Sequence, residues 1–293
     1  MALTEEQLKQ RRSGIGGSEI AAILGEDAFS SPFDVWLAKT QGWVRPSNPD
    51  MERGAHLEAG IAEWYAARTG AVLVESATQR HAMIGIALCT PDRFERVGPR
   101  SESAPSGSRR LISIKSPRRG DAWGKDETDD VPPGYLLQLQ WEHAVCGSMM
   151  TLAPDMRLVA LVDGDLRIYE TQADLEIQAW LLEYAQQWWA RHVVGGEQPP
   201  LDGSSEANRW LRTKFPRDTA PIRPASMAED LGMLELRAVE SDLKRLEGEA
   251  MALKLALMQA IGDAGGLESP TGIITYRADK NGKRSFRTKW ETK

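Results

Sequence analysis

The segment RRLISIKSP, residues 109–117, alternates apolar and polar side chains over most of its length and stops at a proline. Alternation with a period of two is typical of a β-strand, and proline rarely continues a strand inside a sheet. We therefore predict a strand over 109–117. Residues two apart in a strand point to the same face, so Ser113 and Lys115 are expected to share one face.

Further strand patterns lie on both sides of this segment. AVLVES (71–76) predicts one strand, and IGIALCTPDRFERV (84–97) predicts another that ends near Asp92. The turn-rich segment GPRSESAPSGSR separates this second strand from the third. MRLVALVDGDLRIYET (156–171) predicts a β-hairpin, because an Asp-Gly pair between two alternating runs is a favoured two-residue turn.

Helical patterns surround these strands. Ser31 followed by Pro32 is typical of a helix start, and Gly70 is typical of a helix end. The order of elements is helices, a run of strands, a helix, a hairpin and a helix, which predicts an α/β fold with a mixed central sheet flanked by helices. The predicted helices cover residues 4–12, 13–25, 31–43, 51–70, 133–147 and 173–196.

The C-terminal third has a different pattern. Residues 201–226 contain proline and serine without periodicity and predict a linker between a core domain over 1–200 and an extension over 227–293. The extension begins with a heptad pattern, which fits either a coiled-coil or partner helix or a helix packed on its own domain. It ends in a predicted hairpin with Asn281-Gly282 at its turn. From Tyr276 to Lys293 there are seven Lys or Arg and two acids, which fits a solvated strand edge or, as a second interpretation, a DNA contact.

Composition excludes several classes of protein. The chain has 293 residues, 41% of them hydrophobic, which is enough for one large domain with an appended element. Two cysteines make neither a disulfide framework nor a zinc pattern. No apolar run is long enough to span a membrane, and the first residues lack the apolar stretch of a signal peptide. We expect a cytoplasmic protein. The net charge of −6 does not exclude DNA, because affinity depends on local basic clusters.

The strand over 109–117 also carries candidate catalytic residues. Phosphodiester hydrolysis needs a positioned water, a base and positive charge near the leaving oxygen, and Mg²⁺ held by carboxylates supplies much of this. The pattern expected is an Asp at the end of one strand and an acid-x-Lys on the next. The sequence offers Asp92 and Ser113-Ile114-Lys115, with Ser113 at the position of the second acid. Alone, these residues fit a turn Asp and an exposed Lys better than a catalytic site.

A series of motifs in a fixed order gives this pattern its weight. RRSGIGGSEIAAILG, SPFDVWLAKTQG, RGAHLEAGIAEWYAARTG, PDRF, LISIKSPRRG and GYLLQLQWEHAVCG follow one another over residues 11–147. The ordered set resembles the YqaJ-like viral recombinase family, relatives of the lambda-type exonuclease with the PD-(D/E)xK nuclease motif. The resemblance covers about the first two-thirds of the chain.

The resemblance implies a fold, an activity and partners. It implies a restriction-endonuclease-like core and a 5′-to-3′ exonuclease that degrades one strand of linear double-stranded DNA with Mg²⁺ or Mn²⁺. It also implies a ring-shaped trimer, a single-strand annealing protein as partner, and a phage or prophage gene expressed in a bacterial host.

Several site residues follow from the same resemblance. Asp92 matches the metal-binding Asp, the Ile114 backbone carbonyl a metal ligand, and Lys115 the catalytic Lys. Glu58 matches a helical Glu near a second metal, and the pattern also places it on one helix face with Ile61 and Tyr65. Tyr135 and Gln138 match a Tyr-x-x-Gln motif on one helix face, which amphipathic packing also explains.

Basic residues predict the contact with DNA. Arg12 and Ser18 match the part of the family that binds the 5′ phosphate, and a glycine-rich helix start with an adjacent Arg suits an anion, although it can also be only a helix start. Arg118 and Arg119 follow the strand of Lys115 and, with Arg109 and Arg110, form a local basic cluster.

Ser113 departs from the family pattern, which has Glu there. A neutral hydroxyl is a poor Mg²⁺ ligand, so the loss should weaken metal binding and slow hydrolysis. Three explanations remain open: a deliberate inactivating substitution, an acid that has moved to a neighbouring element with Glu58 or Glu102 as candidates, or natural loss of activity.

Two functions of different class are therefore carried forward. One is the metal-dependent exonuclease, and the other is a catalytically inactive protein that binds DNA ends or acts as a recombination scaffold. A restriction- or repair-type endonuclease on the same core is a third possibility, distinguished by cutting of closed circular DNA.

Overall fold

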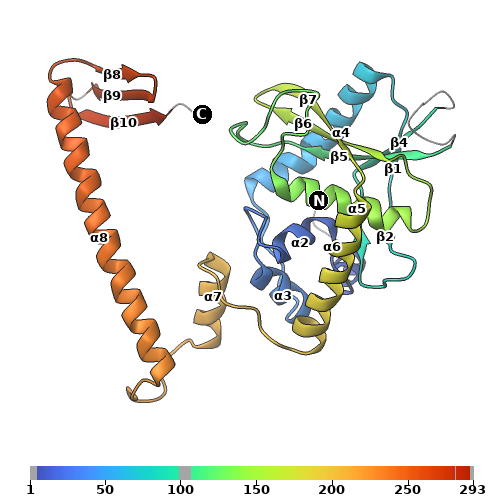
Figure 1. Ribbon diagram of the computed structural model, residues 1–293, viewed down its shortest axis with the longest axis horizontal. Helices are drawn as coiled ribbons and strands as arrows, with labels where there is room; N and C mark the ends of the chain where they lie inside the picture. The colour runs from blue at the N-terminus through green and yellow to red at the C-terminus, as the bar shows by residue number, and fades with distance from the viewer. Residues whose placement is uncertain (1–4, 99–106, 281, 291–293) are drawn as a thin grey trace. The chain divides into compact units, whose positions relative to one another are not determined.

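The computed structural model describes residues 5–98, 107–280 and 282–290, and it divides the chain into two compact units (Figure 1). Unit 1 is Met1–Pro216 and unit 2 is Arg217–Lys293. Each unit is described by itself.

A five-stranded mixed sheet forms the centre of unit 1, as predicted. Its strand order is β1 (Leu73–Glu75), β4 (Arg93–Arg96), β5 (Arg109–Lys115), β6 (Asp155–Val162) and β7 (Asp165–Gln172). Only β5 and β6 pair in parallel. A parallel pair needs a long crossover, and helix α5 (Pro133–Gly147) lies within it. The hairpin β6–β7 has the predicted two-residue turn, since Val162 pairs with Asp165.

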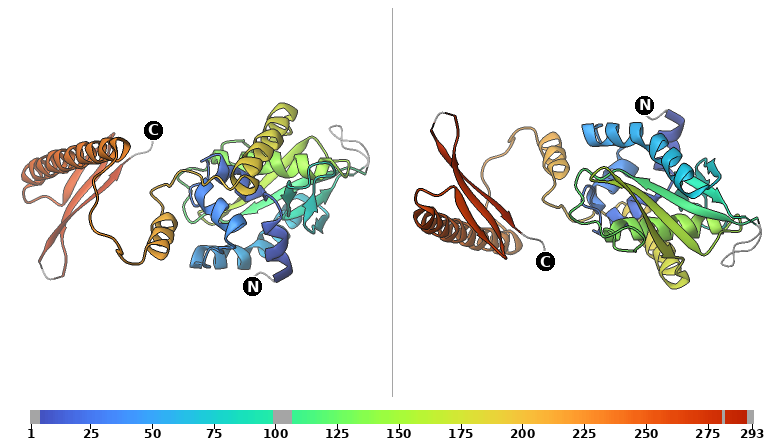
Figure 2. Two further views of the ribbon diagram at one scale, coloured as in Figure 1. Left: turned by 90° about the horizontal axis from the view of Figure 1, so that it is seen from below. Right: turned by 90° about the horizontal axis from the view of Figure 1, so that it is seen from above.

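Helices cover both faces of the sheet (Figure 2). One face carries α2 (Gly17–Ile23), α3 (Pro32–Thr40), α5 and α6 (Leu175–Trp188), and the other carries α4 (Pro49–Thr69). The apolar residues of β5 divide between the faces as strand alternation requires. Leu111 packs with the cluster of α2 and α5, whereas Ile112 and Ile114 pack with Ile61 and Tyr65 of α4.

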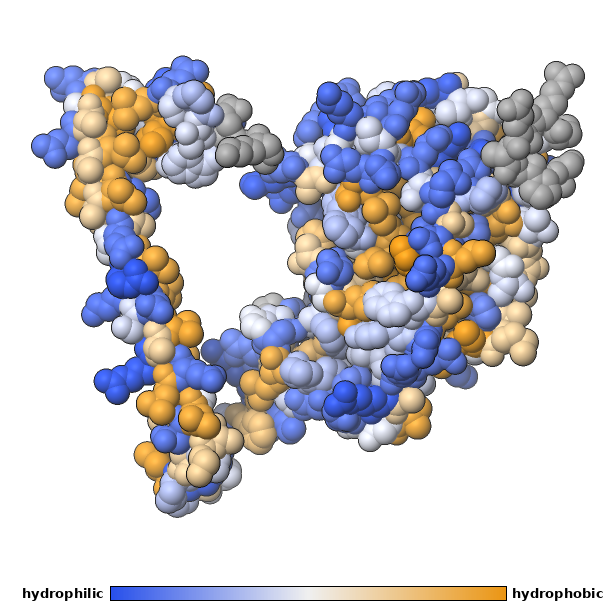
Figure 3. Space-filling view, viewed as in Figure 1, coloured by the Kyte–Doolittle hydropathy of each residue, from blue (hydrophilic) through white to orange (hydrophobic). Residues whose placement is uncertain are grey.

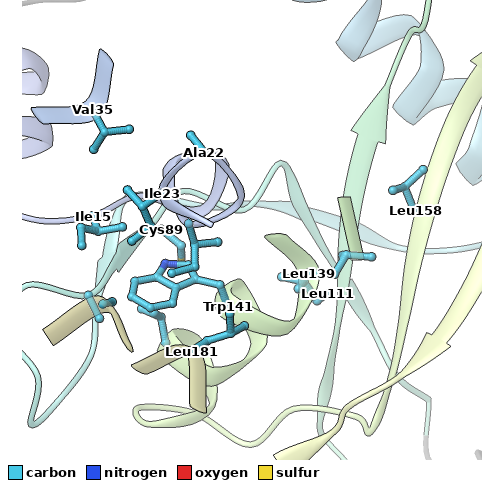
Figure 4. Close-up of a cluster of buried hydrophobic side chains, with 14 of the residues drawn as sticks. Ile15, Ala22, Ile23, Val35, Cys89, Leu111, Leu139, Trp141, Leu158 and Leu181 are labelled. Carbon is cyan, nitrogen blue, oxygen red and sulfur yellow. The ribbon is translucent and has the colours of Figure 1, made fainter. Parts of the chain in front are cut away.

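The larger core lies between the sheet and the helices α2, α3, α5 and α6. Figure 4 shows Trp141 of α5 among Ile23, Cys89 and Leu181, while Leu139 lies next to Leu111 of the sheet. Trp141 is fully buried and its indole N–H donates to the carbonyl of Leu88 at 2.8 Å. This packing fixes which face of α5 is turned to the sheet.

The predicted strand over 84–97 is broken in the structure. Leu88–Cys89 (β3) pairs with Gln79–Arg80 (β2) in a separate two-stranded sheet, and β4 begins only at Arg93. The Ile15 backbone N–H donates to the Ile86 carbonyl, and the Ile15 carbonyl accepts the Leu88 N–H. These hydrogen bonds hold β3 away from the main sheet. Asp92 therefore precedes a strand and does not end one.

The helix ends agree with their sequence signals. Ser31 accepts a hydrogen bond from the Asp34 backbone N–H at 3.2 Å and caps α3, and Gly70 ends α4 with a φ of 74°, a value that glycine adopts without strain. The remaining helices of unit 1 are α1 (Glu5–Arg12), the π-helical segment η1 (Trp189–Val194) and α7 (Ser205–Lys214).

Helix α7 lies inside the segment predicted as a linker. Its Trp210 makes edge contacts with the rings of Phe33 and Trp36, 5.3 and 6.1 Å away, and its indole N–H donates to Gln41. Aromatic packing explains why a segment without clear periodicity joins unit 1. The stretch from Arg212 to Ser226, by contrast, is exposed throughout.

Unit 2 consists of one long helix and a small sheet. Helix α8 (Met227–Ile261) is followed by β8 (Gly266–Ser269), β9 (Gly272–Ala278) and β10 (Arg284–Trp290), which pair antiparallel in the order β10-β9-β8. The predicted hairpin corresponds to β9 and β10, although Asn281 lies outside the described residues. Ile261 and Ile274 are buried, so the sheet packs at the C-terminal end of α8. Apolar side chains stand exposed along the helix (Figure 3).

No helix among the described residues is both long enough and apolar enough to cross a bilayer.

Candidate active site

Asp92 occupies the gap left where β4 starts. The β4–β5 ladder ends with Arg93 opposite Ile112, so the backbone N–H of Ile114 has no partner in β4. The Asp92 Oδ2 atom accepts that N–H at 2.7 Å. The N–H and C=O of one strand residue point to the same side, so the Ile114 carbonyl is turned toward this gap as well.

Lys115 and Ser113 meet the same carboxylate. The Lys115 Nζ atom lies 3.9 Å from Asp92 Oδ2, and the Ser113 hydroxyl donates to that oxygen at 3.2 Å. The Ser113 side chain is buried, so this hydrogen bond satisfies it. Strand alternation therefore brings Asp92, Ser113 and Lys115 together on the sheet face that α5 covers.

Helix α5 brings three polar side chains, Tyr135, Gln138 and Glu142, near Asp92 and Lys115. Tyr135 stacks on Trp123 with ring centroids 5.3 Å apart, and Lys115 Nζ lies 5.5 Å from the Tyr135 ring centre. Burial raises the pKa of Tyr135, and the charge of Lys115 opposes that effect. Gln138, one turn further along, donates from its amide nitrogen to Glu142 Oε1 at 2.7 Å.

Glu142 is a site residue that the sequence analysis did not identify. It is 2% exposed, and its Oε2 atom has no hydrogen-bond partner among the described residues. Burial, and after it the charge of Asp92, raise the pKa of Glu142 to about 7 against the opposing effects of Lys115 and Gln138. The carboxyl thus lies within electrostatic range of both Asp92 and Lys115. The sequence does hold a sign of this role, which is an acid four residues after Gln138, placed between the apolar residues Trp141 and Val145.

The glycine-rich segment provides the space for this carboxyl. A Cβ atom on Gly17 would lie 2.6 Å from Glu142 Oε1, well inside contact distance. The neighbouring Glu19 accepts the Gly16 backbone N–H at 2.7 Å and pairs with the buried Lys39 at 2.6 Å. This ion pair joins the start of α2 to α3. Gly17, at the start of α2, lies beside Glu142.

Glu58 lies on α4, on the other side of the sheet from Ser113 and α5. Its Oε1 atom is 3.0 Å from the Arg93 guanidinium, which follows Asp92 directly. On the same helix face Ile61 and Tyr65 are buried, as the spacing predicted. The second candidate for a moved acid, Glu102, lies outside the described residues.

The predicted DNA-binding residues are dispersed. Arg12 ends α1 and donates to the Gly42 carbonyl at 3.0 Å, while Ser18 is exposed on α2. Arg118 and Arg119 are exposed after β5, with Arg118 3.8 Å from Asp50. Arg110, predicted as part of the basic cluster, is instead buried between Glu95 and Asp155 at 3.0 and 2.6 Å. A buried guanidinium with two carboxylate partners is structural.

The donor atoms at this place suit a hard cation. Two carboxylates, Asp92 and Glu142, and the Ile114 carbonyl are oxygen donors, and Mg²⁺ is commonly held by one or two carboxylates while it keeps several waters. Glu142 Oε2, buried without a partner, is the observation that fits a missing ligand. No group of three or more His, Cys, Asp or Glu side chains suited to a metal occurs within the described ranges.

The comparison with protein families shows what this region is similar to. Residues 6–149 match the family described as the YqaJ-like viral recombinase domain. Over this stretch the chain is similar to a YqaJ-like viral recombinase domain, and it is called the YqaJ-like domain below. All of the α5 site residues and the Asp92–Lys115 pair lie inside it, so the resemblance drawn from the ordered motifs is confirmed.

The YqaJ-like domain has relatives among known proteins. The uncharacterized protein YqaJ of Bacillus subtilis is 29% identical over 221 residues, which is 72% of this chain, and the match spans 63% of the length of that relative. A crystal structure of LHK-Exo, an alkaline exonuclease from Laribacter hongkongensis, in complex with dAMP superposes with a TM-score of 0.50 at 19% identity, covering 72% of this chain and 97% of that one. A phage-related exonuclease from Haemophilus somnus superposes with a TM-score of 0.46 at 12% identity, covering 63% and 96%. The likeness to the LHK-Exo structure shows a shared fold.

Proposed function

We propose that the YqaJ-like domain is a metal-dependent 5′-to-3′ exonuclease that degrades one strand of linear duplex DNA during phage-type recombination. The observation that carries the proposal is the convergence of Asp92 and Lys115, 3.9 Å apart, with the Ile114 backbone between them. An aspartate that binds a cation beside a lysine that faces the same phosphate is the minimum that the chemistry needs.

Each residue of the candidate site has an expected role in the reaction. Asp92 and the Ile114 carbonyl would hold Mg²⁺ or Mn²⁺, which lowers the pKa of bound water and stabilises charge on the leaving oxygen. Lys115 would orient the attacking water and share the developing charge. Tyr135 packs below the Lys115 ammonium and limits its positions. Glu58 is engaged by Arg93 and would reach a second cation only after that ion pair opens.

The 5′ end of the DNA is assigned to the glycine-rich segment. Arg12 and Ser18 are exposed on successive helices and would meet a terminal phosphate, with Arg12 also donating to the Gly42 carbonyl. Arg118 and Arg119 would contact the backbone beyond the active site. The family resemblance adds a trimeric ring and a single-strand annealing protein as partner, and both belong to this proposal.

Digestion of end-labelled linear duplex with Mg²⁺ or Mn²⁺ tests the activity. We expect nucleotides to be released from 5′ ends, and Asp92→Ala or Lys115→Ala to lower the rate by at least about a hundredfold. Asp121→Ala and Lys125→Ala, at exposed positions on the loop before α5, are matched controls that should digest normally. Full digestion by both site variants would refute the assignment, as would efficient cutting of closed circular DNA.

A second candidate is an inactive DNA-end-binding protein, and Ser113 is the observation that favours it. Ser113 donates to Asp92 where a metal-binding Glu is expected. This candidate predicts that linear duplex binds with a steep salt dependence and is not degraded in Mg²⁺ or Mn²⁺. Light scattering in the same buffers measures the assembly state and distinguishes a trimer from a monomer.

A further inference from the structure

The side chain at position 113 points to the sheet face covered by α5. Leu111, two residues earlier, packs into the core of that face, and Lys115, two residues later, lies over Tyr135 of α5. Ile112 and Ile114 point to the opposite face, where α4 lies. A carboxylate carried at position 113 would therefore project toward α5.

Glu142 brings a carboxyl to the same space from the opposite side. It lies on α5 between the buried residues Leu139 and Val145, beside Gly17 of α2. The charges that act on it are those of Asp92 and Lys115, which are the two partners that an acid at position 113 would have. Glu58, one of the two acids considered from the sequence, lies on the α4 side and is paired with Arg93.

Among the described residues, only one of the two oxygens of the Glu142 carboxyl has a hydrogen-bond partner. Gln138 donates to Oε1 at 2.7 Å, whereas Oε2 is buried with no partner among the described residues. An unpartnered buried carboxyl oxygen costs free energy that a protein rarely accepts without a reason. A cation that Oε2 shares with Asp92 would satisfy it.

Two features hold the carboxyl in this position. Gly17 leaves room for Oε1, with which any side chain there would collide, and the Gln138 amide donates a hydrogen bond to the same oxygen. Both residues belong to segments that the family resemblance placed at the site, and here they act together on one acid.

We propose that Glu142 supplies the second metal-binding carboxylate that Ser113 lacks, with Gln138 and Gly17 as the residues that position it. This inference rests on the proposed metal-dependent nuclease. An acid of helix α5 would then take the place of the strand acid expected at position 113. The natural chain would be a competent enzyme without a Glu at that position.

Metal binding in the absence of DNA is the first test. Titration calorimetry with Mn²⁺ should show binding by the full chain, and Glu142→Gln should weaken it by at least about tenfold while retaining the hydrogen bond from Gln138. Glu52→Gln, an exposed acid on α4, is the matched control and should bind as the natural chain does. Circular dichroism establishes that each variant is folded.

A swap of acids is the second test. Ser113→Glu combined with Glu142→Gln restores one carboxylate to the site, and we expect Mn²⁺ affinity to return to within about threefold of the natural chain, with linear DNA digestion following it. Gly17→Ala displaces the Glu142 carboxyl and should weaken Mn²⁺ binding in the same direction as Glu142→Gln.

The outcomes separate this inference from the proposed function. If Asp92→Asn abolishes Mn²⁺ binding and Glu142→Gln leaves it unchanged, the assignment of Glu142 is wrong and the nuclease site stands. If neither substitution changes Mn²⁺ binding and neither changes digestion, both proposals are wrong.

Discussion

At the scale of single residues, Glu142 has a measurable cost when no metal is bound. Burial holds its pKa at about 7, against an ordinary value of 4.5. Below pH 4.5 the carboxyl is neutral in the folded and unfolded chains and costs nothing. As the pH rises to 7, only the unfolded chain ionises freely, so stability is lost. The difference of about 2.5 pKa units corresponds to about 3 kcal/mol.

The prediction compares Glu142→Gln with the natural chain in a chelator. Urea unfolding at several pH values should show the variant gaining about 3 kcal/mol relative to the natural chain between pH 4 and pH 8, with no further gain above pH 8. The facing charges of Asp92 and Lys115 act on the Glu142 carboxylate only in the natural chain, so their opposing effects are part of the pH dependence that the substitution removes. A difference that does not change with pH would mean that Glu142 is not held neutral by burial.

Sequence reasoning could find some residues of the site and not others, for a physical reason. Strand alternation places Lys115 and position 113 on one face, and the resemblance of the ordered motifs to the family added Asp92 and the role of Lys115. Glu142 was not predictable, because its role depends on which side of α5 faces the sheet. That side is fixed by Trp141 and Leu139 packing against residues far away in the sequence.

At the scale of elements, a chain of buried charges joins three strands to α4. Arg110 of β5 pairs with Glu95 of β4 and Asp155 of β6, and Arg157 of β6 bonds both Glu95 and the Tyr65 hydroxyl. Lys115 is the last residue of β5, and Asp92 directly precedes β4. The charge network therefore sets the register on which the active site depends.

Removal of Arg110 is expected to be strongly destabilising. Arg110→Met leaves Asp155 buried without its guanidinium, and the loss of one partner from a buried ion pair costs about 3–5 kcal/mol. Arg96→Met, at an exposed position of β4, is the control and should change stability by less than about 0.5 kcal/mol. Denaturant unfolding measures both variants, and equal stability of the two would contradict a structural role for Arg110.

The elements themselves followed the sequence where local signals were sufficient. Helices with caps and the hairpin around Asp163 were predicted close to their observed ends. The strand over 84–97 was not, because its first half pairs with β2 and with the backbone of Ile15, contacts that local alternation does not encode. The burial of Arg110 was missed for the same reason, since a basic residue in a strand gives no sign of carboxylates on its neighbours.

At the scale of the whole molecule, the chain is two compact units joined by an exposed stretch. Residues 212–226 are exposed, while Trp210 of α7 is packed on unit 1. We predict that limited trypsin digestion cuts first at Arg217 or Arg223 and leaves an N-terminal fragment that retains metal-dependent digestion of linear DNA. Mass spectrometry of the fragments locates the cut, and early cleavage inside unit 1 would contradict the division.

The basic strands of unit 2 give the last prediction, which concerns how the molecule holds its substrate. Arg277 on β9 and Arg287 and Lys289 on β10 are exposed, and exposed cations of this kind bind phosphates without reading sequence. If they contact DNA, Arg287→Ala with Lys289→Ala should weaken binding equally for all sequences and lower the slope of log affinity against log salt by about two. The matched control is Lys244→Ala with Lys254→Ala on α8, which should leave the slope unchanged. A slope that is the same in both double variants would mean that the basic strands are only a solvated edge, and that substrate binding depends on the YqaJ-like domain alone.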